Sequence, residues 1–318
     1  MIINDISLAR KALLNDDVVA IPTETVYGLA GNAYSEKAIR KIFALKNRPF
    51  YNPLIVHIAS VAQLPTIAKD IPALALQLAA TFWPGPLTLL LKKQQVIPDL
   101  VTAGKDTVAV RVPNHTVTQQ LLRELDFPLV APSANPFGSI SPTTSAHVFQ
   151  YFNDTIPIIL EGGPCIKGVE STIIGFEGDV PVLYRLGAIA TEAIEQITGP
   201  LQKVTHAKNQ PNAPGMLNRH YAPHTTTYLT DNVWQLVQQF PNQKIGLLLW
   251  KEKAHEQANV YSITLSSTAN MEEAAANLYA SLHQLDDMHL DVIIAERLPD
   301  SDLGKTINDR LQRATQQW

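Results

Sequence analysis

Short apolar segments alternate with segments of helical periodicity from the start of the chain. Residues 35–46 and 72–83 carry apolar side chains at the spacing of an amphipathic helix. Strand-like runs rich in branched residues stand before, between and after them, at 17–21, 53–58, 87–91, 107–112, 128–132, 156–160 and 171–176. This alternation predicts a mixed α/β domain.

The helix predicted over residues 35–46 has a clear start. Ser35 is a suitable N-cap, and Glu36 places a negative charge in the first turn, where it favours the helix dipole. The apolar face consists of Ala38, Ile39, Ile42, Phe43 and Leu45. Arg40 and Lys41 fall off that face, so we expect them on a solvated surface.

The chain changes character at residues 200–223, which are polar, contain four prolines and show no sustained periodicity. This composition predicts a linker. Residues 224–318 alternate again between strand-like and helical patterns, which predicts a second, smaller α/β domain. We therefore divide the chain into a domain at 1–199, the linker, and a domain at 224–318. Helices of the second domain are expected near 231–239, 270–285 and 303–315.

Composition limits the classes of function. The 318 residues are 46% hydrophobic and 17% charged, with a formal net charge of −4, which is typical of a soluble globular protein and disfavours wrapping of a long nucleic acid. The single cysteine, Cys165, excludes an intramolecular disulfide framework and a multi-cysteine zinc site. Because no signal-peptide pattern and no run of about 18 apolar residues occurs, we expect a cytoplasmic protein.

Several common catalytic signatures are missing. Neither a P-loop nor a G-x-G-x-x-G after a strand occurs, which disfavours a P-loop kinase and a Rossmann dehydrogenase. His220 and His224 are four positions apart, but Pro223 between them disfavours a helical zinc pair. Without a nucleophilic serine elbow or cysteine signature, positioning and charge stabilisation are the expected means of catalysis.

Polar loops stand directly beside several predicted strands. They are PTETVYGLAG (22–31), KNRPFYN (46–52), APSANPFGSISPT (131–143) and VESTI (169–173). Because open α/β sheets gather ligands at strand ends, several such loops favour one shared site. The hydroxyls and amides of 131–143 suit phosphate oxygens or a purine and ribose, although a simple cluster of turns is the alternative.

Four cations lie among these loops and strands: Lys46, Arg48, Arg111 and Arg185. Arg111 stands inside an apolar strand, so it needs either an acidic neighbour or a ligand as its partner. With few obvious carboxylate neighbours, the four cations together match a polyanion such as a nucleoside triphosphate better than a neutral metabolite.

The order of the motifs resembles a known family. PTETVYGL, K-x-RP followed by NPLIVH, WPGPLTL, VAVRVP, APSAN with SPT, GVESTI and PGMLNRHYAP occur in order over residues 21–224. They resemble the YrdC-like threonylcarbamoyl-AMP synthases, in the long form whose extra domain is similar to the segment 298–314. The resemblance implies an N-terminal domain with a twisted mixed sheet and a concave basic pocket, followed by a smaller Rossmann-like α/β domain.

The resemblance also implies a reaction. L-threonine, bicarbonate and ATP would give L-threonylcarbamoyladenylate and pyrophosphate, a nucleotidyl transfer in which a carbamate oxygen attacks the α-phosphorus. Magnesium is expected with ATP, and no organic cofactor. The product would pass to a downstream threonylcarbamoyl transferase complex that forms N6-threonylcarbamoyladenosine in tRNA. Direct tRNA contact is expected to be weak or indirect, and no membrane is involved.

Site residues follow from the same resemblance. Those implied for threonine are Thr25, His57, Arg111, the backbone of Ala131, and Ser171. Those implied for ATP are Lys46, Arg48, Asn52, Thr107, Ser133, Asn135, Ser141, Arg185 and Tyr221, with Lys46 and Arg48 as the catalytic pair. The linker becomes a candidate lid that brings Arg219, His220 and Tyr221 to the site, with a passive tether as the alternative. Phe50 and Tyr51 depart from the usual pattern and leave the shape of the ATP pocket open.

Two other functions are compatible with parts of the sequence. An RNA-binding module with a basic concave surface would bind tRNA in a salt-sensitive way without nucleotide turnover. A carbamoyl-adenylate-forming protein of metalloenzyme maturation would carry zinc-finger cysteines, which a single cysteine in the chain does not provide.

Overall fold

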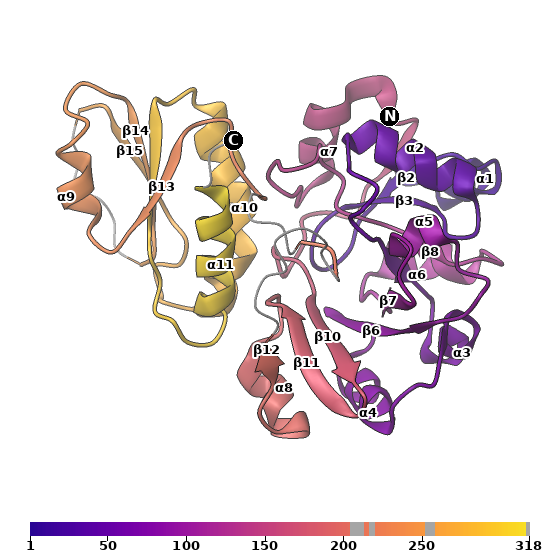
Figure 1. The fold of residues 1–318 in the computed structure, drawn as a ribbon. Helices are drawn as coiled ribbons and strands as arrows, with labels where there is room; N and C mark the ends of the chain where they lie inside the picture. Colours follow the sequence, from indigo (N-terminus) through magenta and orange to yellow (C-terminus); the bar gives the residue numbers. More distant parts are fainter. Residues whose placement is uncertain (204–212, 216–219, 252–257, 316–318) are drawn as a thin grey trace.

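The protein consists of two α/β bodies, each with its own sheet (Figure 1). The computed structural model describes residues 1–203, 213–215, 220–251 and 258–315. The predicted fold class, a mixed-sheet α/β domain with a smaller α/β domain, is confirmed. No helix in these described ranges combines the length and the apolar character that crossing a bilayer requires.

A mixed sheet organises the larger domain, and in the described part of the chain it has 12 strands. Parallel pairs such as β4 with β7 stand beside antiparallel pairs such as β6 with β7. In spatial order the strands are β1 (Ile2–Ile3), β9 (Ile158–Leu160), β2 (Val19–Ile21), β3 (Gly28–Asn32), β8 (Leu129–Val130), β4 (Ile55–His57), β7 (Thr107–Arg111), β6 (Leu87–Lys93), β10 (Thr172–Glu177), β11 (Val180–Arg185) and β12 (Gln202–Lys203), with β5 (Ala68–Lys69) paired to β6.

Helices cover the large sheet because its strands are apolar on both faces. Val19 and Ile21 of β2 belong to one apolar cluster and Ala20, between them, to another, as the alternation of a strand requires. The helices are α1 (Ile6–Leu14), α2 (Glu36–Lys46), α3 (Leu64–Ile67), α4 (Ala73–Phe82), α5 (Asp99–Thr102), α6 (Thr116–Arg123), α7 (Ser145–Phe152) and α8 (Thr191–Thr198), with 3₁₀ turns at Val61–Gln63 and Asn153–Thr155.

The smaller domain is a parallel sheet with helices on both faces. In spatial order its strands are β13 (Thr227–Thr230), β16 (Val292–Glu296), β14 (Ile245–Leu249) and β15 (Val260–Thr264), and its helices are α9 (Val233–Val237), α10 (Met271–Asp287) and α11 (Gly304–Ala314). Leu247 packs with residues of α9, whereas Leu248 packs with residues of α10 and α11. Figure 1 shows α10 and α11 on the side that faces the larger domain.

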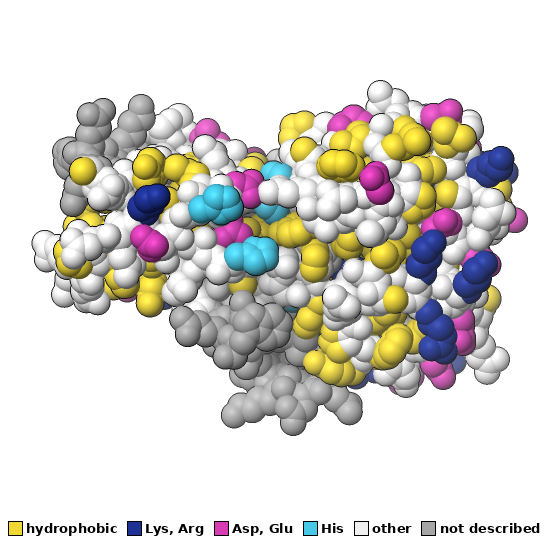
Figure 2. Space-filling view, turned by 90° about the horizontal axis from the view of Figure 1, so that it is seen from above, with side chains coloured by type: hydrophobic (Ala, Val, Ile, Leu, Met, Phe, Trp, Pro, Cys, Tyr) yellow, Lys and Arg dark blue, Asp and Glu magenta, His cyan; other side chains and the backbone are white. Residues whose placement is uncertain are grey.

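The two domains are in contact. One apolar cluster joins Val26 and Val169 of the larger domain to Leu278 of α10 and Ile307 of α11. The space-filling view shows the two bodies meeting along a seam, near which histidine side chains gather (Figure 2). The segment predicted as the linker contains β12 near its start, and this strand extends the large sheet by pairing with β11. Residues 204–212 and 216–219 of this segment lie outside the described residues.

Helix α2 follows its sequence prediction closely. The Ser35 hydroxyl accepts the Ala38 N–H at 3.3 Å, which confirms the predicted N-cap. Arg40 lies in solvent beside Glu36, as expected. The helix ends at Lys46, and its C-cap Asn47 has a left-handed φ of 50°, which turns the chain inward at Arg48.

Candidate active site

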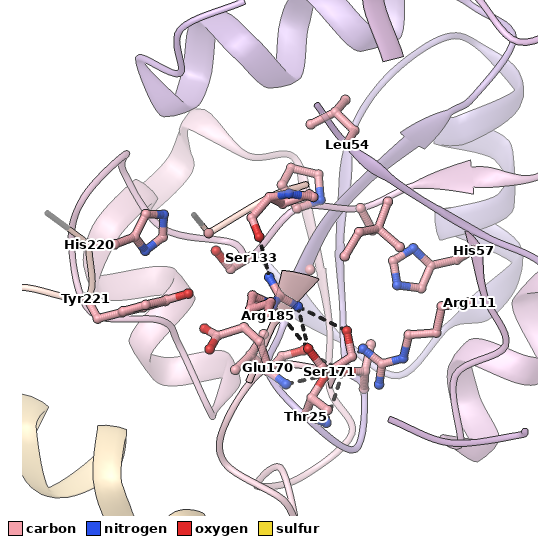
Figure 3. Close-up of a pocket in the computed structure, with 18 of the residues that line it drawn as sticks. Thr25, Leu54, His57, Arg111, Ser133, Glu170, Ser171, Arg185, His220 and Tyr221 are labelled. Atoms are coloured by element: carbon pink, nitrogen blue, oxygen red, sulfur yellow. Dashed lines mark hydrogen bonds between the residues drawn. The ribbon is translucent and has the colours of Figure 1, made fainter. Parts of the chain in front are cut away.

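A pocket lies at the strand ends of the larger domain, on the side where the smaller domain docks (Figure 3). The residues of the two implied ligand sets that line it are Thr25, Arg48, His57, Arg111, Ala131, Ser133, Ser171, Arg185 and Tyr221. His57 and Arg111 stand on one side of the close-up and His220 and Tyr221 on the other. The structure thus brings together residues from polar loops that are far apart in the sequence.

Arg111 is paired with an acid of its own domain. Its Nη2 lies 2.7 Å from Glu24 Oε1, and both side chains are buried. Nη1 donates to the Thr25 hydroxyl at 2.9 Å, and Nε donates to the Gly85 carbonyl at 3.2 Å. The scarcity of carboxylate neighbours inferred from the sequence is therefore wrong for Arg111. Its charge is already balanced, so a ligand carboxylate would share the guanidinium with Glu24.

His57 is a neutral ring in this pocket. His57 on β4 lies opposite Arg111 in the register of the parallel strand β7, and its side chain is buried. Burial, followed by the charge of Arg111, lowers the pKa of His57 to about 3. Its Nδ1 has no hydrogen-bond partner in the described part of the chain, so it is free to bind a polar group of a ligand.

Arg48 enters the pocket from the end of α2. Its Nε donates to the Asn52 carbonyl at 3.2 Å and its Nη2 to the Pro53 carbonyl at 2.7 Å. Burial lowers the pKa of Arg48 to about 9, and the nearby charge of Arg185 acts in the same direction. The group stays cationic at neutral pH, and an anion beside it would offset the cost of its burial.

Arg185 is another buried cation of the pocket, and most of its hydrogen-bond partners are carbonyl groups. Nε and Nη2 donate to the Ser171 carbonyl at 3.1 and 2.8 Å, Nη2 also donates to the Ser171 hydroxyl at 3.0 Å, and Nη1 donates to the Pro214 carbonyl at 3.1 Å. The Ser171 hydroxyl also contacts the Thr88 hydroxyl at 2.7 Å. Burial lowers the pKa of Arg185. The guanidinium is thus fixed by neutral partners that leave its charge for a ligand.

Tyr221 closes the opposite side of the pocket in an unusual backbone conformation. Its φ is 66°, a region that costs free energy for a non-glycine residue and is frequent at functional sites. Its hydroxyl is buried and has no hydrogen-bond partner among the described residues. Gly215 has a φ of 80°, and a Cβ there would lie 2.8 Å from that hydroxyl. This wall therefore requires a glycine and offers an unused hydroxyl to a ligand.

The remaining implied ATP residues do not line the pocket: Lys46, Asn52, Thr107, Asn135 and Ser141. The ammonium group of Lys46 donates to the Ser133 carbonyl at 2.5 Å and to the Asn135 carbonyl. Burial, followed by the charge of Arg48, lowers the pKa of Lys46 well below its usual value. Lys46 therefore lies buried behind the 131–143 loop and is bound to its carbonyl groups.

The other four behave differently from one another. Both polar side-chain atoms of Asn52, and Oδ1 of Asn135, are buried without a hydrogen-bond partner among the described residues. Thr107 stands at the start of β7, at the end opposite Arg111. The Ser141 hydroxyl donates to Glu170 at 2.6 Å rather than to the pocket space. Their roles toward ATP stay predictions, and Arg219 lies outside the described residues.

Two carboxylates of the site were missed by the sequence analysis. Glu24 belongs to the PTETV segment and Glu170 to VESTI, segments chosen for their hydroxyl groups. Glu170 lines the pocket and accepts hydrogen bonds from Tyr279 and Arg310 of the smaller domain. Adjacency to Ser171 was its only signal in the sequence.

The described residues do not form a protein-held metal cage. No group of three or more His, Cys, Asp and Glu side chains that could hold a metal ion occurs among them. A magnesium ion that accompanies ATP needs no such cage, because phosphate oxygens and water supply most of its ligands.

Comparison with known families finds two matches that together span nearly the whole chain. Residues 11–187 match the family of Sua5, YciO and YrdC, described as "Telomere recombination". Residues 189–316 match the family described as "Threonylcarbamoyl-AMP synthase, C-terminal domain".

Individual relatives are similar over their full length. The threonylcarbamoyl-AMP synthase of Bacillus subtilis is 40% identical over 323 residues, covering 98% of this chain and 93% of the relative. That of Pyrococcus abyssi is 39% identical over 324 residues, covering 98% and 94%. The crystal structure of P. abyssi Sua5 complexed with L-threonine superposes with a TM-score of 0.92 at 38% identity, covering 99% of this chain and 97% of that one.

Proposed function

The chain belongs to the threonylcarbamoyl-AMP synthase family, and from this premise we propose that it forms L-threonylcarbamoyladenylate and pyrophosphate from L-threonine, bicarbonate and ATP. The resemblance inferred from the motifs is confirmed. The protein is therefore an enzyme of the nucleotidyltransferase type.

One observation carries the proposal: two sets of groups line one pocket. Arg111 and His57 offer donors that could bind the threonine part beside Glu24, and Arg48 with Arg185 offers two positive charges for the triphosphate. The reaction needs this arrangement, because a threonine-derived carbamate and a triphosphate repel each other in water. The relative from P. abyssi, of nearly the same fold, is described with L-threonine bound, which supports threonine as the amino-acid substrate.

The residues of this chain would act by positioning. We assign Arg111 to the threonine carboxylate, with Thr25 and neutral His57 beside it. Arg48 and Arg185, with Lys46 behind the 131–143 loop, would hold the triphosphate. The threonine amine and bicarbonate give a carbamate with loss of water. A carbamate oxygen then forms a bond to the α-phosphorus as the bond to the β-phosphate oxygen breaks and pyrophosphate leaves.

Magnesium belongs, in this proposal, to the ATP substrate. The triphosphate supplies oxygen ligands of the kind the ion prefers, and the ion enters and leaves with the nucleotide and its product. We further propose that the unstable product passes to a threonylcarbamoyl transferase complex for N6-threonylcarbamoyladenosine formation in tRNA, and that both steps take place in the cytoplasm.

The RNA-binding alternative has less support. Lys46, Arg48 and Arg185 are buried inside the protein, whereas phosphate groups of a long RNA need cations at the surface. The full-length relatives are named as synthases and favour the enzymatic function.

Pyrophosphate release from purified full-length protein tests the proposal. With ATP present, release is expected to require both threonine and bicarbonate, and omission of either should abolish it. Arg48→Ala, purified in the same way, serves as the control for contaminating ATPases and is expected to lower release by about 10²-fold or more. Equal release without threonine, or from Arg48→Ala, would contradict the proposal.

A further inference from the structure

Glu170 connects the pocket to the smaller domain. In Figure 3 it lies between Ser171 and Tyr221, and it lines the pocket. Its carboxylate accepts three side-chain hydrogen bonds: from the Ser141 hydroxyl at 2.6 Å, the Tyr279 hydroxyl at 2.9 Å and Arg310 Nε at 2.9 Å. Two of the three donors come from α10 and α11. A part of the pocket wall is therefore held from the other domain.

Arg310 contacts several groups besides Glu170. Its side chain is fully buried, its Nη2 donates to the Leu186 carbonyl at 2.6 Å, and its Nη1 pairs with Asp309. Its guanidinium carbon lies 4.8 Å from the centre of the Tyr221 ring, within cation–π distance. One side chain of α11 thus holds both Glu170 and the aromatic ring that closes the pocket.

The charge of Glu170 explains why such a partner is needed. Among the described residues that line the pocket, it is the one carboxylate. Left unpaired, it would oppose the entry of a triphosphate and attract the guanidinium of Arg185, whose charge the phosphates need. Arg310 balances that charge from behind the wall, so Arg48 and Arg185 remain available on the pocket side.

We propose that Arg310 is a positioning residue for the nucleotide, which neutralises Glu170 and supports the Tyr221 ring from the smaller domain. Docking of the smaller domain thereby completes the ATP side of the site. The inference rests on the proposed function, since it takes ATP as the ligand. The smaller domain thus takes part in the site through a residue that no sequence motif marked.

Kinetics and binding of full-length variants test this inference. Arg310→Met is expected to raise both the KM for ATP and the Kd of a non-hydrolysable ATP analogue by at least about tenfold, while the KM for threonine changes by less than about threefold. Arg310→Lys, which keeps the charge, should recover part of the loss. Adding Glu170→Gln to Arg310→Met should also recover part of the ATP affinity, because no unpaired carboxylate remains.

Lys305→Met is the matched control. Lys305 also lies on α11 and forms an ion pair with the larger domain, but its partner Glu192 does not line the pocket. It should keep the KM for ATP within about twofold of the wild type. Equal losses in Lys305→Met and Arg310→Met, equal weakening of both substrates, or no recovery in the double variant would overturn the inference. If Arg310→Met does not fold, Arg310→Lys alone must still raise the KM for ATP more than that for threonine. A wild type that releases no pyrophosphate would instead overturn the proposed function.

Discussion

The strand-end wall of the pocket, formed by Thr25, His57 and Arg111, is held within one domain. The interdomain wall, formed by Glu170 and Tyr221, is supported from behind by Arg310 of the smaller domain. The first wall stands on the pairing of β4 with β7 and on the buried Glu24. The second depends on a contact between residues 140 positions apart.

This difference separates two ways of preparing a site. The strand-end wall exists as soon as the larger domain has folded, so a ligand there meets preformed groups. The interdomain wall is complete only when α10 and α11 are docked. A ligand that binds this wall therefore stabilises the docked state, by an amount set by the difference between its affinities for the docked and undocked states. We therefore expect the two substrates to differ in their dependence on the smaller domain.

The largest expected effect is that of Arg111→Ala in the strand-end wall. Glu24 would be left as a buried, unpaired charge, so the free energy of unfolding should fall by about 3–5 kcal/mol. Turnover at fixed threonine should fall by about 10²-fold or more, since the carboxylate clamp is lost. Denaturant unfolding and pyrophosphate release measure the two losses separately.

A second substitution distinguishes the two consequences. Adding Glu24→Gln to Arg111→Ala removes the unpaired charge and should restore part of the free energy of unfolding, but none of the turnover. If stability does not recover, the ion pair is not what holds this wall.

The two walls also differ in how far the sequence could predict them. The cap at Ser35, the end of α2 and the strand-end loops are local features, and the sequence placed them well because turns and periodicity are set by neighbouring residues. The ion pairs of Arg111 with Glu24 and of Glu170 with Arg310 form only because folding brings these side chains together. The free energy of burial and the docking of the two domains determine such pairs, and a local sequence pattern does not predict them.

The stability of the protein at low pH depends on one neutral histidine near each wall. His57 stands in the strand-end wall. His283 stands behind the interdomain wall, with its Nε2 3.3 Å from the Ser141 carbonyl and its ring stacked at 4.0 Å on His147. Burial first, then Arg111 in one case and His147 in the other, lowers the pKa of each ring from 6.5 to about 3. Asp286 acts on His283 in the opposite direction.

The sign of the pH dependence follows from these lowered values. Between pH 6.5 and 3 the unfolded chain binds a proton that the folded chain excludes, so the stabilisation is complete above pH 6.5 and is lost as the pH falls. Each ring should cost about 2 kcal/mol between pH 6.5 and pH 5. Urea unfolding at pH 7 and pH 5 should show this loss reduced in His57→Gln and in His283→Gln. If His283→Gln loses as much free energy of unfolding between pH 7 and pH 5 as the wild type does, the interdomain wall already opens at pH 5.

Tyr279→Phe is expected to have a smaller effect on the interdomain wall. It removes the hydroxyl that donates to Glu170 but keeps the ring that stacks on Tyr221 at a centroid distance of 5.6 Å. Ser141 and Arg310 remain as partners of the carboxylate, so the free energy of unfolding should fall by about 1–2 kcal/mol. Tyr228→Phe, at an exposed tyrosine of β13, is the control and should change nothing measurable. A larger loss of ATP affinity than in Arg310→Met would contradict the ranking of the two partners.

The smallest expected effect is that of Arg40→Ala. This substitution tests whether the substrate site is confined to the pocket between the strand-end and interdomain walls. Arg40 and Arg48 are both cations of the α2 region, but Arg40 lies in solvent with its Nη2 3.1 Å from Glu36 Oε2, whereas the left-handed turn at Asn47 directs Arg48 into the pocket. An exposed pair at this spacing contributes about 0.3–0.5 kcal/mol, so Arg40→Ala should leave turnover within about twofold of the wild type. Pyrophosphate release measured beside Arg48→Ala makes the comparison. Equal damage from the two substitutions would mean that the exposed face of α2 binds a substrate or a partner, and that the pocket is larger than its two walls.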